Sequence, residues 1–179
     1  MRQDAGMTAP DASAPAPIVA EAMKKAAVAW VAAPDQPATA LWCLPLDGGL
    51  YVVSGPGEQQ APGLADTDTA VVTLRGDHGG RIVTWPAAVT RVMPGTEEWE
   101  TAVPQLAAKR LNAPGPADAL AARWAAECVV QRLTPAGEPT EAGATLADSD
   151  QAEPARESTA VRPARRPFRL HRVRRPNGN

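Results

Sequence analysis

The stretch LYVVSGPGEQQAPGLADTDTAVVTLRGDHGGRIVTWPAAVTRVM, residues 50–93, decides the fold of this chain. It begins with β-forming residues up to Ser54, breaks in a loop rich in glycine and proline, and resumes β character over Ala70–Arg75. After a turn at residues 76–80, a further strand is predicted to run to Met93, with Pro86 at a bulge or an edge. The stretch therefore predicts antiparallel strands joined by loops.

Working outward, the sequence adds two strands before this stretch and one after it. Residues 27–32 and 39–44 read as strands, and Asp47-Gly48 is typical of a tight hairpin turn because its positions need positive φ. Helical spacing predicts helices over residues 17–27, 96–111 and 118–127, and a last strand follows at 128–133. Such segregated helices and strands predict an α+β fold with an antiparallel sheet closed into a barrel. The strands are nearly continuously apolar, so both faces should be covered, by barrel interior on one side and by helix or a second subunit on the other.

Two features of the second helix are predicted from single residues. Thr96 is placed to cap the N-terminus, followed by acidic residues that suit the helix dipole. Pro104 should kink the helix or restart it, because proline lacks the N–H that an internal helical turn needs.

Composition divides the chain into one domain and two tails. Residues 1–16 and 138–179 are poor in periodic apolar residues and are predicted to be disordered, which leaves a domain at 17–137. The second tail is acidic and then rich in arginine. A solvated tail is favoured there over a site for nucleic acid or another polyanion. We expect deletion of residues 138–179 to leave thermal stability nearly unchanged.

The two cysteines, Cys43 and Cys128, lack metal-type spacing and are expected to be small buried side chains in a reducing compartment. The sequence shows no membrane-spanning run and no signal-peptide pattern, so a cytoplasmic location is expected. No metal site is predicted. No residue is singled out as catalytic, because no Ser, His and Asp arrangement or carboxylate pair has distinctive spacing.

Candidate ligand-binding residues come from the strand ends and the loop at 55–63. The glycines of this loop are explained either by a hairpin or by a close backbone approach to a ligand. Arginines at neighbouring strand ends could converge on an anion or lie at the rim, and two tryptophans could line a flat cofactor ring or belong to the core. The candidate cofactor-binding residues are Trp42, Ser54, Gly55, Gly57, Gln59, Gln60, Arg75, Arg81 and Trp85.

The order of these segments resembles the pyridoxamine 5'-phosphate oxidase-like split-barrel family. The pattern is carried by residues 29–32, 41–54, 70–74, 83–92, 97–99 and 108–111. The resemblance implies a six-stranded split barrel flanked by short helices, a homodimer, and FMN or a deazaflavin bound between subunits.

One departure from the family bears on the cofactor. Flavin-binding members usually carry Lys or Arg in the loop after the third strand, whereas this chain has Glu58-Gln59-Gln60. A phosphate facing Glu58 without a loop cation would be held poorly, so Arg75 or Arg81 must substitute or the grip is lost. Two hypotheses follow: an FMN- or deazaflavin-dependent oxidoreductase, and a cofactor-free split barrel that serves as a binding or structural module.

Overall fold

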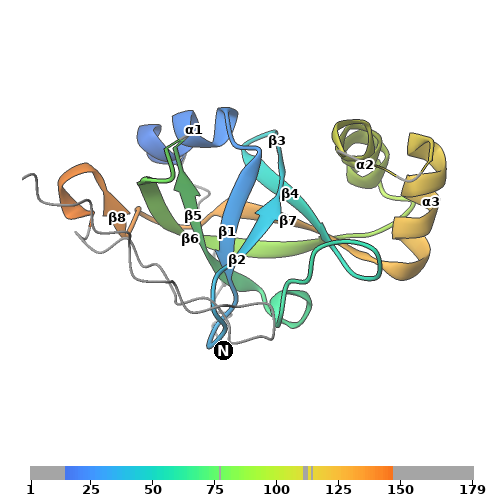
Figure 1. Cartoon of the computed structure of the whole chain (residues 1–179), viewed down its shortest axis with the longest axis horizontal. Coiled ribbons are helices and arrows are strands. Elements are labelled where there is room, and N and C mark those ends of the chain that lie inside the picture. The colour runs from blue at the N-terminus through green and yellow to red at the C-terminus, as the bar shows by residue number, and fades with distance from the viewer. Residues whose placement is uncertain (1–14, 77, 111–112, 114, 147–179) are drawn as a thin grey trace, which may run out of the picture.

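The computed structural model describes residues 15–76, 78–110, 113 and 115–146. One antiparallel sheet forms the body of the molecule, in the order β2-β1-β5-β6-β7-β4-β3, with the short β8 paired to β6 (Figure 1). Its strands are β1 (Val28–Ala32), β2 (Thr39–Trp42), β3 (Leu44–Leu46), β4 (Gly49–Ser54), β5 (Thr69–Arg75), β6 (Arg81–Val92), β7 (Val129–Pro135) and β8 (Glu141–Ala142).

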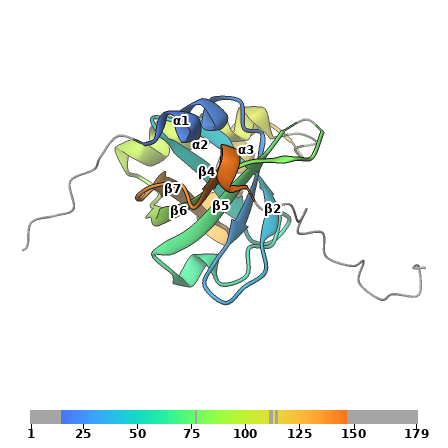
Figure 2. The ribbon, with the colours of Figure 1, turned by 90° about the vertical axis from the view of Figure 1, so that its left-hand side faces the viewer.

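The two ends of this sheet are one continuous piece of chain. β2 pairs with β1 at one end of the strand order and β3 pairs with β4 at the other, and only Cys43 separates β2 from β3. The sheet is therefore rolled up, and the segment from Thr39 to Leu46 joins its two ends. Figure 2 shows the strands curving round with α1 above them. The α+β antiparallel barrel predicted from the sequence is confirmed.

The strand count differs from the six that were expected. One expected strand is divided at Cys43 into β2 and β3, because the chain changes its pairing partner there. β8 is additional, and it lies beyond Gly137, where the sequence had placed the end of the domain. The remainder of the predicted tail, residues 147–179, lies outside the described residues, as do residues 1–14.

Pro86 occupies neither a bulge nor an edge. It lies inside β6, opposite Val71 of β5, and its carbonyl accepts from the N–H of Ala136 at 2.9 Å. The N and C=O groups of one strand residue point to the same side of the strand. The Pro86 nitrogen therefore points to the side where β6 pairs first with β8 and then with β7, and it lies in the gap between these two pairings. The missing donor is therefore tolerated in the middle of the sheet.

The described residues form three α-helices and two short 3₁₀ turns: α1 (Pro17–Lys24), α2 (Glu97–Lys109), α3 (Ala117–Glu127), η1 (Leu64–Asp66) and η2 (Gly143–Thr145). The predicted cap of α2 is confirmed, since Thr96 Oγ1 accepts from the N–H of Trp99 at 3.2 Å. Pro104 lies within α2 without ending it, so a restarted helix is wrong. The Asp47-Gly48 turn has the positive φ values expected, 46° and 73°.

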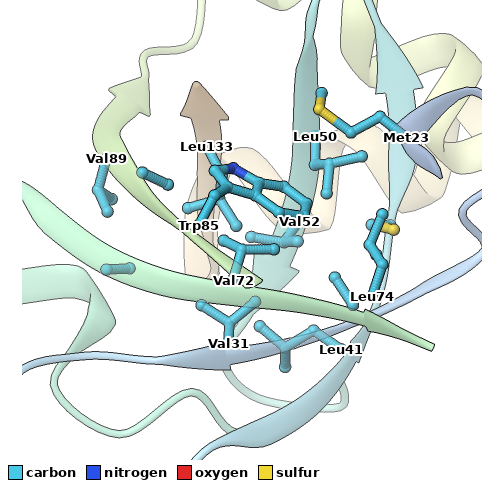
Figure 3. Packing of buried hydrophobic residues seen from close by; sticks show 14 of the residues in the cluster. Met23, Val31, Leu41, Leu50, Val52, Val72, Leu74, Trp85, Val89 and Leu133 are labelled. Carbon is cyan, nitrogen blue, oxygen red and sulfur yellow. The ribbon is translucent and has the colours of Figure 1, made fainter. Parts of the chain in front are cut away.

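Two apolar clusters lie on opposite faces of the sheet. The first fills the barrel and is closed by Val19 and Met23 of α1; Figure 3 shows Trp85 among its members. The second lies between the outside of the barrel and helices α2 and α3, around Trp99 and Trp124. All six residues of β4 are buried, and the four from Leu50 to Val53 enter the two clusters alternately. The expectation that such strands are covered on both faces is confirmed for β4.

Candidate functional site

The loop that follows β4 is anchored by Glu58. Its side chain is 0 % exposed and pairs with Arg110 Nε at 2.8 Å through Oε2. Its Oε1 accepts from Trp124 Nε1 at 2.9 Å and from Arg123 Nη2. Arg110 follows α2 and Arg123 lies on α3, so a single carboxylate ties the loop to both helices.

Glu58 therefore does not present a free negative charge to a ligand. Burial alone would raise the pKa of Glu58, but the hydrogen bonds from Trp124, Arg110 and Arg123 outweigh it and hold the pKa below its ordinary value of 4.5. The case considered from the sequence, a phosphate that faces an unpaired Glu58, therefore does not arise, because Arg110 and Arg123 pair with this carboxylate. A contact between residues more than 50 positions apart has no local signal in the sequence.

The two loop glycines make close approaches to the protein itself. Gly55 has a φ of 137°, and a Cβ there would lie 3.0 Å from the Cα of Cys128. A Cβ on Gly57 would lie 2.9 Å from Nη1 of Arg123. The backbone thus packs tightly against α3 and the start of β7, which is a different reason for glycine from the approach to a ligand considered above.

Gln59 fastens the same loop to β2. Its Oε1 accepts from the backbone N–H of Trp42 at 2.7 Å, and its Nε2 donates to the carbonyl of Ala40 at 2.9 Å. The side-chain amide thereby takes the place of a neighbouring strand along this part of β2. Gln60 is exposed and Ser54 is buried.

The structure separates the remaining candidates from this loop. Trp85 is 0 % exposed in the barrel interior, so it cannot line a cofactor ring. Arg81, with a 4 % exposed side chain, pairs with Glu141 of β8 at 2.8 Å. Arg75 lies 5.0 Å from the centre of the Trp30 ring and donates to the carbonyl of Gly79 at 3.0 Å. Of the two alternatives left open for the strand-end arginines, these contacts give no support to a convergence of Arg75 and Arg81 beside the loop.

A groove of about 750 Å³ opens beside Trp42 and Gln59, and we call it the basic groove. It lies where the C-terminal ends of α1 and α2 come together above β2 and β3, and Figure 1 shows β3 between the two helices. The lining residues are Lys24, Lys25, Ala26, Ala27, Trp42, Cys43, Pro45, Gln59, Ala108, Lys109 and Arg110. All three lysines of the chain line this groove.

Trp42 is fixed in the wall of the basic groove by its aromatic and cationic neighbours. Arg110 lies 5.5 Å from the centre of the Trp42 ring, and Trp124 lies behind it with ring centres 6.2 Å apart. Arg110 both pairs with Glu58 and lines the basic groove, so it connects the anchor of the loop to the groove. Two of the residues predicted from sequence, Trp42 and Gln59, are thus brought together with four cationic residues that the sequence did not single out as a site.

Cys43 also lines the basic groove, but its thiol is unsuited to act as a nucleophile. Burial raises the pKa of Cys43 to about 12, so the reactive thiolate is scarce at neutral pH. Burial likewise raises the pKa of Cys128. Among the described residues no cluster of His, Cys, Asp and Glu side chains is placed to hold a metal ion. Within the same residues, every helix is too short or too polar to cross a membrane.

Comparison with solved structures identifies the fold. HutZ, the heme storage protein from Vibrio cholerae, superposes with a TM-score of 0.51 at 15% identity, over 66% of this chain and 88% of HutZ. The fold is that of the pyridoxamine 5'-phosphate oxidase-like split barrels. A candidate pyridoxamine 5'-phosphate oxidase from Listeria innocua matches with a TM-score of 0.43 at 13% identity, over 65% of this chain and 90% of the other. No protein-family model and no curated protein sequence matches this split barrel.

Proposed function

We propose that this split barrel binds a phosphate-bearing aromatic cofactor, FMN or a deazaflavin, in the basic groove and acts as an oxidoreductase. The observation that carries the proposal is the basic groove itself: about 750 Å³, walled by Trp42, lined by cationic side chains and without a carboxylate among its described lining residues. Ligand pockets for molecules of this size span roughly 300–1,000 Å³.

The residues of the basic groove fit such a cofactor in chemical type. A flat ring system needs apolar and aromatic wall, which Trp42, Pro45 and the alanines of the lining supply. A phosphate needs charge-assisted donors, which the lysines supply. When bound, the cofactor supplies the hydride chemistry, and the protein supplies binding and orientation. This accords with the lack of a recognisable acid–base pair in the sequence.

The protein is further proposed to be a homodimer located in the cytoplasm. The outward side of β1, β5 and β6 carries apolar side chains that are partly exposed: Val28 at 47 %, Val71 at 45 % and Ile82 at 38 %. A second copy would cover them, as the continuous apolar strands already suggested. Two free cysteines, Cys43 and Cys128, suit a reducing compartment.

Titration of the purified protein with FMN and with a deazaflavin tests the cofactor, read by the shift of the ligand absorbance band and by quenching of its fluorescence. Trp42→Leu should weaken binding of either cofactor, because it removes aromatic wall, whereas Trp30→Leu changes a tryptophan outside the groove lining and serves as the matched control. Reduction of the bound cofactor by an added hydride donor, followed at the same wavelengths, then tests the oxidoreductase activity.

The result that would overturn the proposal is specific. If neither ligand binds at concentrations up to about 1 mM, equivalent to roughly −4 kcal/mol, the cofactor-free binding module becomes the better description.

A further inference from the structure

We infer that the basic groove holds a phosphate group from the ends of two helices, through Lys25 at the end of α1 and Lys109 at the end of α2. This deepens the proposed function and rests on it only insofar as the phosphate belongs to a flavin. In this arrangement Lys25 and Lys109 have the role that loop cations have in the resembled family and that the sequence had suggested for Arg75 or Arg81.

The first support is the distribution of lysine. The chain contains fifteen arginines and three lysines, and all three lysines lie in the lining of the basic groove. Lys24 and Lys25 come from the end of α1, whereas Lys109 comes from the end of α2, more than 80 positions later. Tertiary structure brings them to one groove. Lysine is a compact charge on a flexible stem and is a common ligand of phosphate groups.

The second support is the local charge balance. Lys24 pairs with Glu21, and Arg110 pairs with Glu58. Lys25 and Lys109 form no ion pair with another side chain in residues 15–76, 78–110, 113 and 115–146. Two lysine charges therefore enter the same groove, and none of its lining residues in the described part of the chain is a carboxylate.

Cations at helix C-termini also stabilise the helices themselves, and this structural role competes with phosphate binding as an explanation for the lysines. Each helix end carries a partial charge of about −0.5, and one cation there stabilises the helix by a few tenths of a kcal/mol to about 1 kcal/mol. Two helix ends supply about one negative charge in total, against two lysine charges that form no ion pair among the described residues, where the neighbouring Glu21 is paired with Lys24. About one positive charge remains for an anionic ligand after the helices are satisfied.

Glu58 has a positioning part in this arrangement. It holds Arg110 by an Nε–Oε2 contact of 2.8 Å, and Arg110 in turn lies beside the Trp42 ring. The Glu58 carboxylate pairs with Arg110 and Arg123, and no ion pair joins it to Lys25 or Lys109 among the described residues. The phosphate is accordingly assigned to the lysines, and Arg110 to the wall that holds Trp42.

The test uses inorganic pyrophosphate alone, followed by calorimetric titration of the full chain at low salt. Lys25→Ala and Lys109→Ala should each weaken pyrophosphate binding about tenfold, the loss expected for one charge-assisted hydrogen bond. Arg91→Ala is the matched control, since it removes an exposed cation of β6 outside the groove lining and should change affinity less than twofold. Binding should weaken as salt rises.

A second pair of ligands separates the phosphate site from the ring site. FMN should bind more tightly than riboflavin, which has the same ring without the phosphate, and this preference should vanish in the Lys25→Ala/Lys109→Ala double variant. Circular dichroism confirms that each variant is folded. If the double variant binds pyrophosphate as the wild type does, or if the wild type binds none, the inference is wrong.

The two proposals fail in different ways. If pyrophosphate binds through the lysines but no flavin or deazaflavin binds, the phosphate site stands and the proposed cofactor is wrong. If FMN and riboflavin bind equally and pyrophosphate does not bind, the ring site stands and the phosphate assignment to Lys25 and Lys109 is wrong.

Discussion

At the scale of single residues, the side chain whose interpretation changes most is Glu58. In the sequence it lies in the loop where flavin-binding members of the resembled family usually carry a cation, so it was interpreted as unfavourable for a phosphate. In the structure it accepts hydrogen bonds from Arg110, Arg123 and Trp124 and is fully covered. Its function is to hold the loop after β4 against α2 and α3.

Replacing Glu58 with Gln should lower the free energy of unfolding by about 2 kcal/mol, because hydrogen bonds to a charged group contribute about 1.5–3 kcal/mol and the arginines would lose their counter-charge. Chemical denaturation at neutral pH measures the loss. Glu100→Gln, which changes an exposed carboxylate of α2, is the control and should cost less than about 0.5 kcal/mol. Equal stability of the two variants would contradict the assigned role.

The same residue makes stability depend on pH. Because the pKa of Glu58 is lower in the folded protein than its ordinary value of 4.5, its contribution is complete above about pH 4.5 and is lost as the pH falls through the lower, folded value. Melting temperatures recorded from pH 6 downward should therefore fall more steeply below about pH 4.5 in the wild type than in Glu58→Gln.

At the scale of elements, the loop glycines show what fixes the path between β4 and the helices. Gly55→Ala should cost about 3 kcal/mol, because φ is 137° and the new Cβ would lie 3.0 Å from the Cα of Cys128. Gly95→Ala, at a φ of 80° with open space around it, should cost about 1 kcal/mol. Urea unfolding of both variants compares them, and a Gly55→Ala variant as stable as Gly95→Ala would show that the loop can move away.

β8 is the second element with a testable contribution. A chain ending at Gly137 should be less stable than a chain ending at Leu146 by about 2 kcal/mol. Without residues 138–146, Arg81 loses its ion pair with Glu141, and the start of β6 loses its pairing with β8. This revises the expectation that everything after residue 137 is dispensable for stability. Thermal melts of the two truncated chains decide between them, and identical melting temperatures would restore the original expectation.

Most of these elements could be predicted from the sequence because their signals are local. Nearly continuous runs of apolar and β-forming residues predicted the strands, the Asp47-Gly48 pair predicted a turn, and Thr96 predicted a helix start. The site could not be predicted in the same way. The placement of Lys25 and Lys109 in one groove, and the pairing of Glu58 with Arg110, depend on how two helices meet a barrel, and scarce lysine was the one signal available.

At the scale of the whole molecule, we predict a homodimer assembled through the outer side of β1, β5 and β6. Sedimentation should give a species of twice the chain mass of 18.7 kDa. Val71→Arg should produce the monomer, because it places a charge among partly exposed apolar side chains. Met93→Arg, at a residue that is 49 % exposed beyond the end of β6, is the control and should remain dimeric. A wild-type protein that sediments at one chain mass at micromolar concentration would refute the prediction.

The Gln59 amide has a consequence for self-association through strand addition. An unpaired strand edge offers its N–H and C=O groups as a template on which another chain can add a strand and begin to aggregate. On β2 that edge includes the N–H of Trp42 and the C=O of Ala40, and Gln59 binds both. Gln59 therefore occupies the free hydrogen-bonding groups of β2, the strand at one end of the sheet. A loop side chain thus opposes the addition of a strand from another molecule at this edge.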